Sequence, residues 1–232
     1  MKKLAHVRHY SPNDLKDAKH AQNLNERGFE QVSFHNVRKR METSVTKRAT
    51  SLDEILSFND DNSKNIWQFL DFKEEPLDAN IYPVWLKGIT GKGVLIAIMD
   101  DGLDTKHQDL KDNIDLTASI NLNFPEKFGS SPRGPKDTMP PDELHGTMCA
   151  GLVASIANNT ICSHGVAYRS KIAGIRMLDG PINDALEARS INYALNKTHI
   201  YTASWGPSDD GVYFQPAGPL LTKALEYGTS KV

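Results

Sequence analysis

Val94-Leu95-Ile96-Ala97-Ile98-Met99-Asp100-Asp101-Gly102 is the stretch that decides how this chain of 232 residues folds. A run of apolar residues ends abruptly in two acids and a glycine. Such a run predicts a strand over 94–99 that is buried on both faces and carries Asp100 to the edge of a sheet. We therefore expect a parallel sheet that is covered on both sides.

Strands and helices alternate after this stretch, which is typical of an α/β fold with helices on both faces of a parallel sheet. The polar segment 103–144 is rich in Asp, Asn and Pro and predicts long surface loops. The other predicted elements are a helix over 145–157, a strand over 171–177, a helix over 183–195 capped by Asn183 or Asp184, a strand over 199–204 and a helix over 220–227 ended by Gly228.

Composition limits the classes of function. The content of 39% hydrophobic and 24% charged residues is typical of a soluble globular protein. A net charge of −2 gives no reason to expect nucleic acid or an acidic membrane as a partner. No run of about 18 apolar residues predicts a membrane segment. The start, Met1 to His6, lacks the apolar core of a signal peptide.

His145-Gly146-Thr147 opens the predicted helix 145–157 and places an imidazole at its N-terminus. A buried Asp can fix the tautomer of a His and stabilise its imidazolium form. Asp100 followed by His145 is the chain order of one type of Ser-His-Asp hydrolase. Alone, Asp100 could cap a turn and His145 could be an ordinary helix-terminal residue. Together, in IAIMDDG and HGTMCAG, they favour catalysis.

The stretch from about 82 to 211 resembles the subtilisin-like serine proteases, and specifically the kexin-type proprotein convertases, with the hormone-processing members nearest. The resemblance implies a subtilisin-like three-layer fold in which Asp100 and His145 are the first two triad residues. In that family the nucleophilic Ser and the oxyanion Asn lie further along than Val232. We therefore expect a truncated fold that is inactive as written. The motifs are PVWLKGITGKGV (83–94), IAIMDDGLD (96–104), HGTMCAG (145–151), ANNTIC (157–162), GVAYRSKIAGIRMLDG (165–180) and IYTASWGPSDDG (200–211).

The resemblance also implies a calcium-dependent endopeptidase that cleaves proproteins or prohormones after paired basic residues. Acids cluster in such a protease where arginine and lysine side chains bind, although each acid alone is more often a solvated surface charge. The residues implied are Asp101 and Asp142 for the second residue before the cut, Asp209 for the arginine at the cut, Glu187 for a more distant basic residue, and Ser204, Trp205 and Gly206 as the edge segment that pairs with the substrate backbone.

One departure from the family follows Gly211. Val212-Tyr213-Phe214-Gln215-Pro216 stands where the family usually has Lys-Thr-Val-Asp-Gly, so one acid of the outer pocket is absent. Recognition of a basic residue four places before the cut is therefore not expected to follow the family.

Calcium is the cofactor that the resemblance implies. Oxygen ligands drawn from a loop are what this cation prefers, whereas Asn159 alone could simply be a turn residue. The implied ligands are the side chains of Asp60, Asp109 and Asn159 and the backbone oxygens of Ile156, Ile161 and Ser163.

Residues 1–48 are expected to be a partial propeptide and 49–232 the N-terminal portion of the peptidase domain. Lys47-Arg48 stands where the family's propeptide is cut, although a basic cluster can also be part of a solvated tail. The family further implies the secretory pathway, with the chain's own propeptide and dibasic proproteins as partners.

Two alternatives use the same residues differently. One is a catalytically dead fragment or isoform that binds substrates without cutting them. The other is a zinc-binding module formed by His145 and Cys149, spaced i, i+4, with Cys162 and His164. The family instead implies a disulfide partner for Cys162 beyond Val232.

Two short motifs imitate functional sites. Gly228-Thr229-Ser230 resembles a nucleophile motif, but it follows a predicted helix, so Gly228 is expected to be a C-cap. Gly91-Lys92-Gly93 precedes its strand and lacks the spacing of a phosphate-binding loop.

Overall fold

The computed structural model describes residues 58–66, 68–69, 79–123, 132, 145–178, 180–207, 211–212 and 214–230. Those from 58 to 207 and from 214 to 230 belong to one unit, and Gly211 and Val212 belong to a second. The predicted domain boundary after residue 48, the processing site Lys47-Arg48, Asp142 and Asp209 lie outside the described residues.

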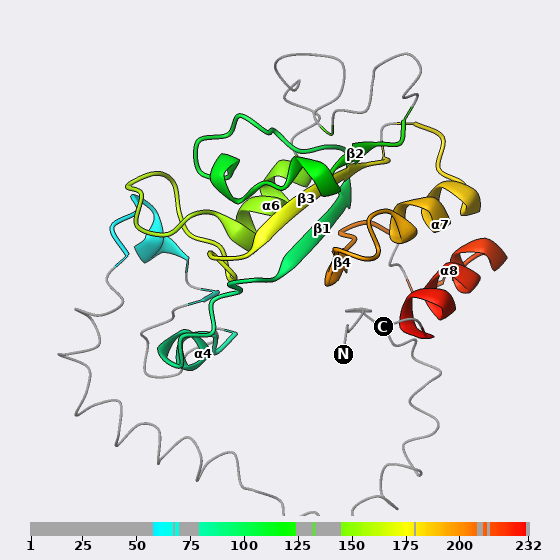
Figure 1. Ribbon diagram of the computed structural model, residues 1–232. Helices are drawn as coiled ribbons and strands as arrows, with labels where there is room; N and C mark the ends of the chain where they lie inside the picture. The colour runs from blue at the N-terminus through cyan, green and yellow to red at the C-terminus, as the bar shows by residue number, and fades with distance from the viewer. Residues whose placement is uncertain are drawn as a thin grey trace, which may run out of the picture. The chain divides into compact units, whose positions relative to one another are not determined.

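A parallel sheet of four strands forms the centre of the first unit (Figure 1). Strand β1 (Leu95–Asp100) is buried along its whole length, as its unbroken apolar run predicts. The sheet order is β2-β3-β1-β4, with β2 at Ile120–Asn121, β3 at Lys171–Arg176 and β4 at Ile200–Thr202. Asp100 pairs in register with Arg176, so β1 and β3 end together at one edge.

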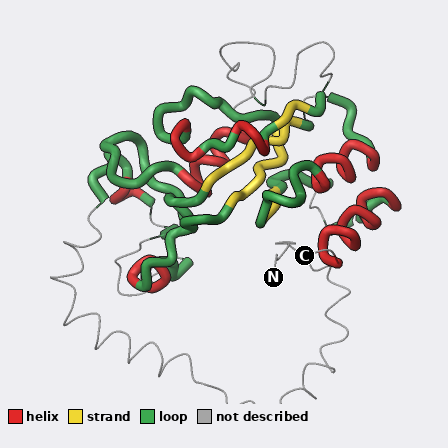
Figure 2. Tube along the Cα trace, in the orientation of Figure 1, coloured by secondary structure: helices red, strands yellow, loops and turns green. Residues whose placement is uncertain are grey.

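Helices cover both faces of this sheet (Figure 2). Helix α6 (His145–Ala154) packs through Ala150 and Ala154 against Ile96 and Ile98 of β1. The alternate residues of β1 face the other way, because successive side chains of a strand point to opposite faces. There they meet helices α7 (Asp184–Asn192) and α8 (Pro219–Ser230). The three-layer α/β fold is confirmed.

Helices α7 and α8 are joined through their first residues. The Asn183 side chain accepts a hydrogen bond from Leu186 N at 3.0 Å, which confirms it as the cap of α7. Asp184 caps α8 instead, because its two carboxylate oxygens accept from Leu220 N and Leu221 N, both at 2.8 Å.

The predicted end of the last helix is wrong. Helix α8 continues through Gly228 to Ser230, and Gly228 does not have the positive φ of a left-handed C-cap. Gly228 is buried, and a Cβ there would lie 3.7 Å from Leu195 Cδ1. Gly228 therefore lies inside the helix and does not end it. Ser230 Oγ donates to Tyr227 O.

The prediction that 103–144 consists of surface loops is wrong for part of the described residues. They include short 3-10 helices at Lys111–Asn113 and Leu116–Ala118 and the strand β2. Leu103 and Leu110 are buried in the core. Polar composition concealed β2, because it is only two residues long and its Asn121 is fully buried beside β3.

An aromatic cluster lies between the start of the described chain and α4 (Tyr82–Leu86). The His164 imidazole stacks on Phe58 with ring centroids 3.7 Å apart, and Trp85 meets it edge-on. Trp85 Nε1 donates to Val166 O at 2.8 Å. These contacts attach α4 to the segment that follows α6.

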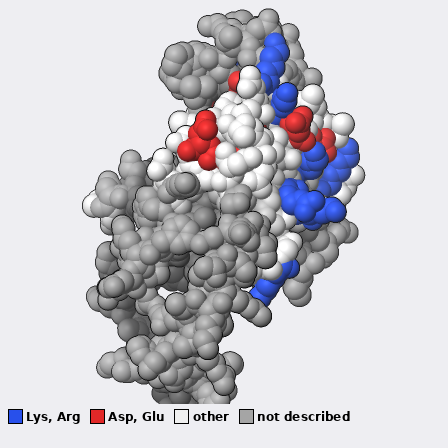
Figure 3. Space-filling model, turned by 90° about the vertical axis from the view of Figure 1, so that its left-hand side faces the viewer, with Lys and Arg blue, Asp and Glu red and all other residues white. Residues whose placement is uncertain are grey.

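Charged side chains are distributed unevenly over the face shown in Figure 3. Lysine and arginine lie with some acids along one margin of the described part, and a separate group of acids lies on the other side of a mostly uncharged area. No helix in the described ranges combines the length and the apolar content that crossing a bilayer requires.

Candidate active site

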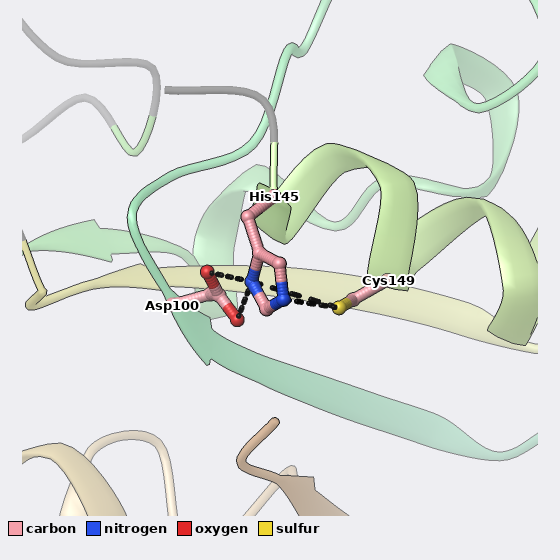
Figure 4. Close-up of side chains that lie close together, drawn as sticks. All are labelled: Asp100, His145 and Cys149. Atoms are coloured by element: carbon pink, nitrogen blue, oxygen red, sulfur yellow. Dashed lines mark hydrogen bonds and ion pairs between the residues drawn. The ribbon is translucent and has the colours of Figure 1, made fainter. Parts of the chain in front are cut away.

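The Asp100 carboxylate and the His145 imidazole meet where β1 ends and α6 begins (Figure 4). His145 Nδ1 lies 2.8 Å from Asp100 Oδ1 and 3.0 Å from Oδ2. Asp100 is 1% exposed, whereas half of the His145 side chain is exposed. A buried carboxylate that accepts from Nδ1–H leaves Nε2 as the proton acceptor, which is the tautomer a general base needs. The structure brings together the two predicted catalytic residues.

The pKa of His145 is raised above its ordinary value. The hydrogen bond to Asp100 is the main cause, burial opposes it, and the negative charges of Asp100 and Asp101 add to the rise. The site therefore stabilises an imidazolium, which is the species formed when His145 takes up a proton.

Asp101 lies at the N-terminus of α6. Its Oδ1 accepts from Gly146 N at 2.7 Å and its Oδ2 accepts from His145 N at 3.1 Å. Burial raises the pKa of Asp101, the Gly146 hydrogen bond lowers it, and the Asp100 charge raises it again. Sequence reasoning missed this capping role, because Asp101 and the helix that it caps are far apart in the chain. Its predicted role in binding a basic substrate residue stays a prediction.

Gly146 allows α6 to approach the turn after β1. A Cβ at this position would lie 2.3 Å from Gly102 O and 2.8 Å from Asp100 Cβ. Thr147 Oγ1 also accepts from Asp104 N at 2.9 Å. Gly146 therefore allows the close approach of α6, and Thr147 binds the turn after β1. Both residues fix the position of His145 next to Asp100.

The Cys149 thiol is one turn along α6 from His145, with Sγ 3.9 Å from both ring nitrogens. Burial is the main cause that raises the pKa of Cys149, although a hydrogen bond with Ser204 lowers it. Among the described residues, only Asp100 joins these two in a group of potential metal ligands. Cys162 is exposed and His164 is buried against Phe58, so the predicted four-residue zinc set is not assembled.

The segment after β4 is tied to the end of β1. Trp205 Nε1 donates to Met99 O at 2.7 Å, next to Asp100. Ser204 and Gly206, its neighbours, are exposed. The three residues predicted to line the substrate backbone thus lie beside the Asp–His pair.

Glu187 is partly buried on α7. Burial raises its pKa, and the charge of Asp184 raises it further. A cation bound next to Glu187 would lower this raised pKa and so favour the ionised carboxylate.

The three side chains among the predicted calcium ligands, those of Asp60, Asp109 and Asn159, come together around the loop after α6. Asp60 accepts from Asn158 N and Asn159 N, both at 2.9 Å. Asn159 Nδ2 donates to Asp109 Oδ1 at 2.7 Å, and Asn159 Oδ1 accepts from Ile161 N. Asn158, Thr160 and Cys162 all have positive φ, so this loop is tightly coiled.

Asp109 is the most buried of these acids, with 1% exposed. Burial raises its pKa, whereas hydrogen bonds from the Asn159 side chain and the Ser163 backbone lower it, and no donor among the described residues lies in full hydrogen-bond geometry with its Oδ2. A buried carboxylate oxygen without a partner is costly, and a hard cation would satisfy it. The oxygen-rich donor set fits calcium, provided that the Asn159 amide presents Oδ1 to the cation.

Known proteins resemble the chain in sequence and in fold. The curated relatives include Furin-like protease 1, isoform 1-CRR, of Drosophila melanogaster (44% identity; 83% of this chain, 17% of the relative), PC3-like endoprotease variant B of Hydra vulgaris (46%; 75% and 24%) and human Furin (40%; 82% and 23%). The chain spans about a quarter or less of the length of these relatives.

Two solved structures share the fold with this chain. The Aeromonas sobria serine protease in complex with the chaperone ORF2 has a TM-score of 0.60 at 23% identity, over 75% of this chain and 29% of that one. A Pseudoalteromonas arctica protease has a TM-score of 0.54 at 23% identity, over 75% and 56%. The Subtilase family, Peptidase_S8, matches residues 91–230, and the chain belongs to this family.

Proposed function

We propose that the protein containing this chain is a serine endopeptidase that cleaves proproteins after paired basic residues. The hydrogen bond between buried Asp100 and His145 Nδ1 carries the proposal. The name of one relative, PC3-like endoprotease, supports endoproteolysis, and the motif resemblance supports paired basic residues as the substrate class. The proposal concerns the whole protein, because the chain spans only part of these relatives.

In the proposed reaction, His145 Nε2 takes the proton of a serine hydroxyl as the serine oxygen bonds to the scissile carbonyl carbon. Asp100 stabilises the resulting imidazolium without taking the proton itself. The imidazolium then protonates the leaving amine as the carbon–nitrogen bond breaks. The family resemblance assigns the serine and the oxyanion asparagine to positions further along than Val232.

Basic substrate side chains would be bound by Asp101, Asp142, Glu187 and Asp209. The raised pKa of partly buried Glu187 supports a site that favours an incoming cation. The exposed residues Ser204 and Gly206 beside anchored Trp205 support pairing with an extended substrate. Charge-assisted hydrogen bonds in a partly dry pocket are worth more than exposed ion pairs.

Calcium is proposed as the structural cofactor of the loop 156–163. Bound there, it would neutralise the charges of Asp60 and Asp109 and take up the unpaired Asp109 Oδ2. The side chains of Asp60, Asp109 and Asn159 and the backbone oxygens of Ile156, Ile161 and Ser163 would hold it.

Maturation is proposed to occur at Arg48-Ala49, within the secretory pathway, with residues 1–48 as part of the propeptide. N-terminal sequencing of the mature protein tests this. A start at Met41, after Arg38-Lys39-Arg40, would assign the cleavage to the other basic cluster.

The activity is tested on the full protein with fluorogenic peptides that end in Lys-Arg or Arg-Arg. We expect Asp100→Asn to lower kcat by about 10⁴, the scale seen when a triad Asp is lost, and His145→Ala to lower it by about 10⁶, the scale seen when a triad His is lost. Asp112→Asn, which changes an exposed acid away from the pair, is the control and should cleave normally. Hydrolysis that survives in His145→Ala would contradict the proposal.

A further inference from the structure

Two neighbouring carboxylates hold the same histidine in different ways. Asp100 accepts from the His145 ring, whereas Asp101 accepts from the backbone N–H groups of His145 and Gly146. These N–H groups begin α6 and have no partner within the helix. The position of the His145 backbone, and not only that of its ring, is therefore fixed from the end of β1.

Asp101 is itself held on several sides and is only 9% exposed. Its carbonyl oxygen accepts from Arg176 Nε at 3.0 Å, and its N–H donates to Asp100 Oδ1 at 2.8 Å. A Cβ on Gly146 would lie 2.9 Å from Asp101 Oδ1, so the carboxylate and α6 are in close contact. The Asp101 side chain cannot shift without moving the helix that carries His145.

We propose that Asp101 is a positioning residue for His145, in addition to any contact that it makes with a substrate cation. Its consequence for catalysis rests on the proposed function, whereas its effect on His145 does not. A carboxylate offers about four acceptor positions, so two backbone hydrogen bonds still leave room for a lysine or arginine side chain. The two roles are therefore compatible in hydrogen-bonding capacity.

The two roles differ in which substrates they affect. A residue that only lines a pocket matters for peptides with a basic residue at the second position before the cut, and acts through KM. A residue that positions His145 matters for every peptide and acts through kcat, because small displacements of a catalytic group are costly.

The charges near His145 give a second readout. Asp100 and Asp101 face it from the end of β1, and the Cys149 thiol faces it from α6. After the hydrogen bond and charge of Asp100, the charge of Asp101 contributes to the raised pKa of His145. Removal of that charge should lower the pKa of His145.

The experiment compares Asp101→Asn with Asp104→Asn in the full protein labelled with ¹³C-histidine. Asp104 is a neighbouring acid whose carboxylate accepts from Lys106 N. We expect the NMR pKa of His145 to fall in Asp101→Asn and to stay unchanged in Asp104→Asn. We also expect kcat to fall about tenfold or more in Asp101→Asn, for basic and apolar residues at the second position alike.

An unchanged pKa of His145, with a loss confined to the KM of peptides with a basic second residue, would overturn the positioning role. If Asp101→Asn does not fold, Asp101→Ser keeps an acceptor for one helix N–H without the charge, and the pKa of His145 should fall in the same way. Absence of His145-dependent hydrolysis in the unmodified protein would instead overturn the proposed protease function, whereas the pKa of His145 in Asp101→Asn would still report the Asp101 charge beside the ring.

Discussion

At the scale of single residues, the Asp–His pair combines a buried acid with a half-exposed ring. The carboxylate is shielded from water, so its hydrogen bond to Nδ1 keeps its direction. The exposed part of the ring remains available for proton exchange. This difference in burial is what allows one side chain to orient and the other to react.

The pH dependence of stability follows from the raised pKa of His145. The protonated ring is favoured in the folded state, so its stabilising contribution is fully present below the unfolded pKa of about 6.5. It is lost as the pH rises through the higher folded pKa. We expect the difference in Tm between the unmodified protein and His145→Gln to shrink above pH 6.5. The corresponding change in the free energy of unfolding should be below about 1 kcal/mol, because the ring is half exposed. A difference that grows as the pH rises would contradict this.

Two glycines of α6 should respond oppositely to alanine. A Cβ at Gly146 would lie 2.3 Å from Gly102 O, so we expect Gly146→Ala to destabilise by about 1–3 kcal/mol or more and to reduce activity. At Gly151 the nearest atom to such a Cβ is Ser155 Oγ at 3.4 Å. Gly151→Ala should be neutral or stabilise by roughly 0.5–1 kcal/mol, because alanine favours a helix interior. Denaturant unfolding measures both, and equal effects would refute the close approach of α6 to the turn.

At the scale of elements, the packing of α8 against α7 depends on the carboxylate of Asp184. Asp184 is the first residue of α7 and accepts from two N–H groups of α8. The N-terminus of α8 is thereby fixed to α7 by charge-assisted hydrogen bonds. Glu187 lies on the same helix, so the placement of this predicted substrate residue depends on the same contact.

Asp184→Ala should cost about 1–2 kcal/mol of stability, because two helix N–H groups lose their acceptor. Asn183→Ala removes one cap bond of α7 and should cost about 1 kcal/mol. Only Asp184→Ala should also lower the pKa of Glu187, because the charge of Asp184 raises it. Chemical denaturation and NMR titration of Glu187 check these effects, and an unchanged pKa of Glu187 would exclude the electrostatic part.

Sequence patterns predicted those elements whose own residues carry the signal. The apolar run before Asp100 predicted β1, and the short polar side chain of Asn183 predicted the start of α7. The end of α8 was mispredicted because Gly228 is buried near Leu195, a contact that local sequence does not contain. Strand β2 was missed because its two residues are stabilised by pairing with β3.

At the scale of the whole molecule, functional groups gather from segments far apart in the chain. Motif recognition predicted Asp100 and His145 because both stand at the junctions of strongly patterned elements. It could not predict that Asp101 caps α6 or that Trp205 binds Met99 O, because both contacts depend on the folded sheet. Asp142 and Asp209 lie outside the described residues and stay predictions.

The loop 156–163 offers a test of the proposed calcium site at this scale, since Asp60, Asp109 and Asn159 come from three distant segments. We expect calcium to raise the Tm of the unmodified protein and to have no effect on Asp109→Asn. Without calcium, Asp109→Asn should be at least as stable as the unmodified protein, because burial disfavours the Asp109 charge. Calorimetry with and without a chelator measures this, with Asp112→Asn as the control that keeps its response. A full calcium response in Asp109→Asn would remove Asp109 from the ligand set.

The two described tryptophans each donate a hydrogen bond to a backbone carbonyl in a different region: Trp85 to Val166, after the coiled loop, and Trp205 to Met99, beside Asp100. Indole fluorescence depends on such hydrogen bonds, so the emission of each tryptophan reports changes in the structure around it. With Trp67 replaced by Phe, we expect the emission of Trp85 to change when calcium binds to the loop 156–163. We expect the emission of Trp205 to change when a substrate peptide binds. Variants that keep only Trp85 or only Trp205 would then separate calcium binding from peptide binding in time, because each binding step has its own fluorescence signal.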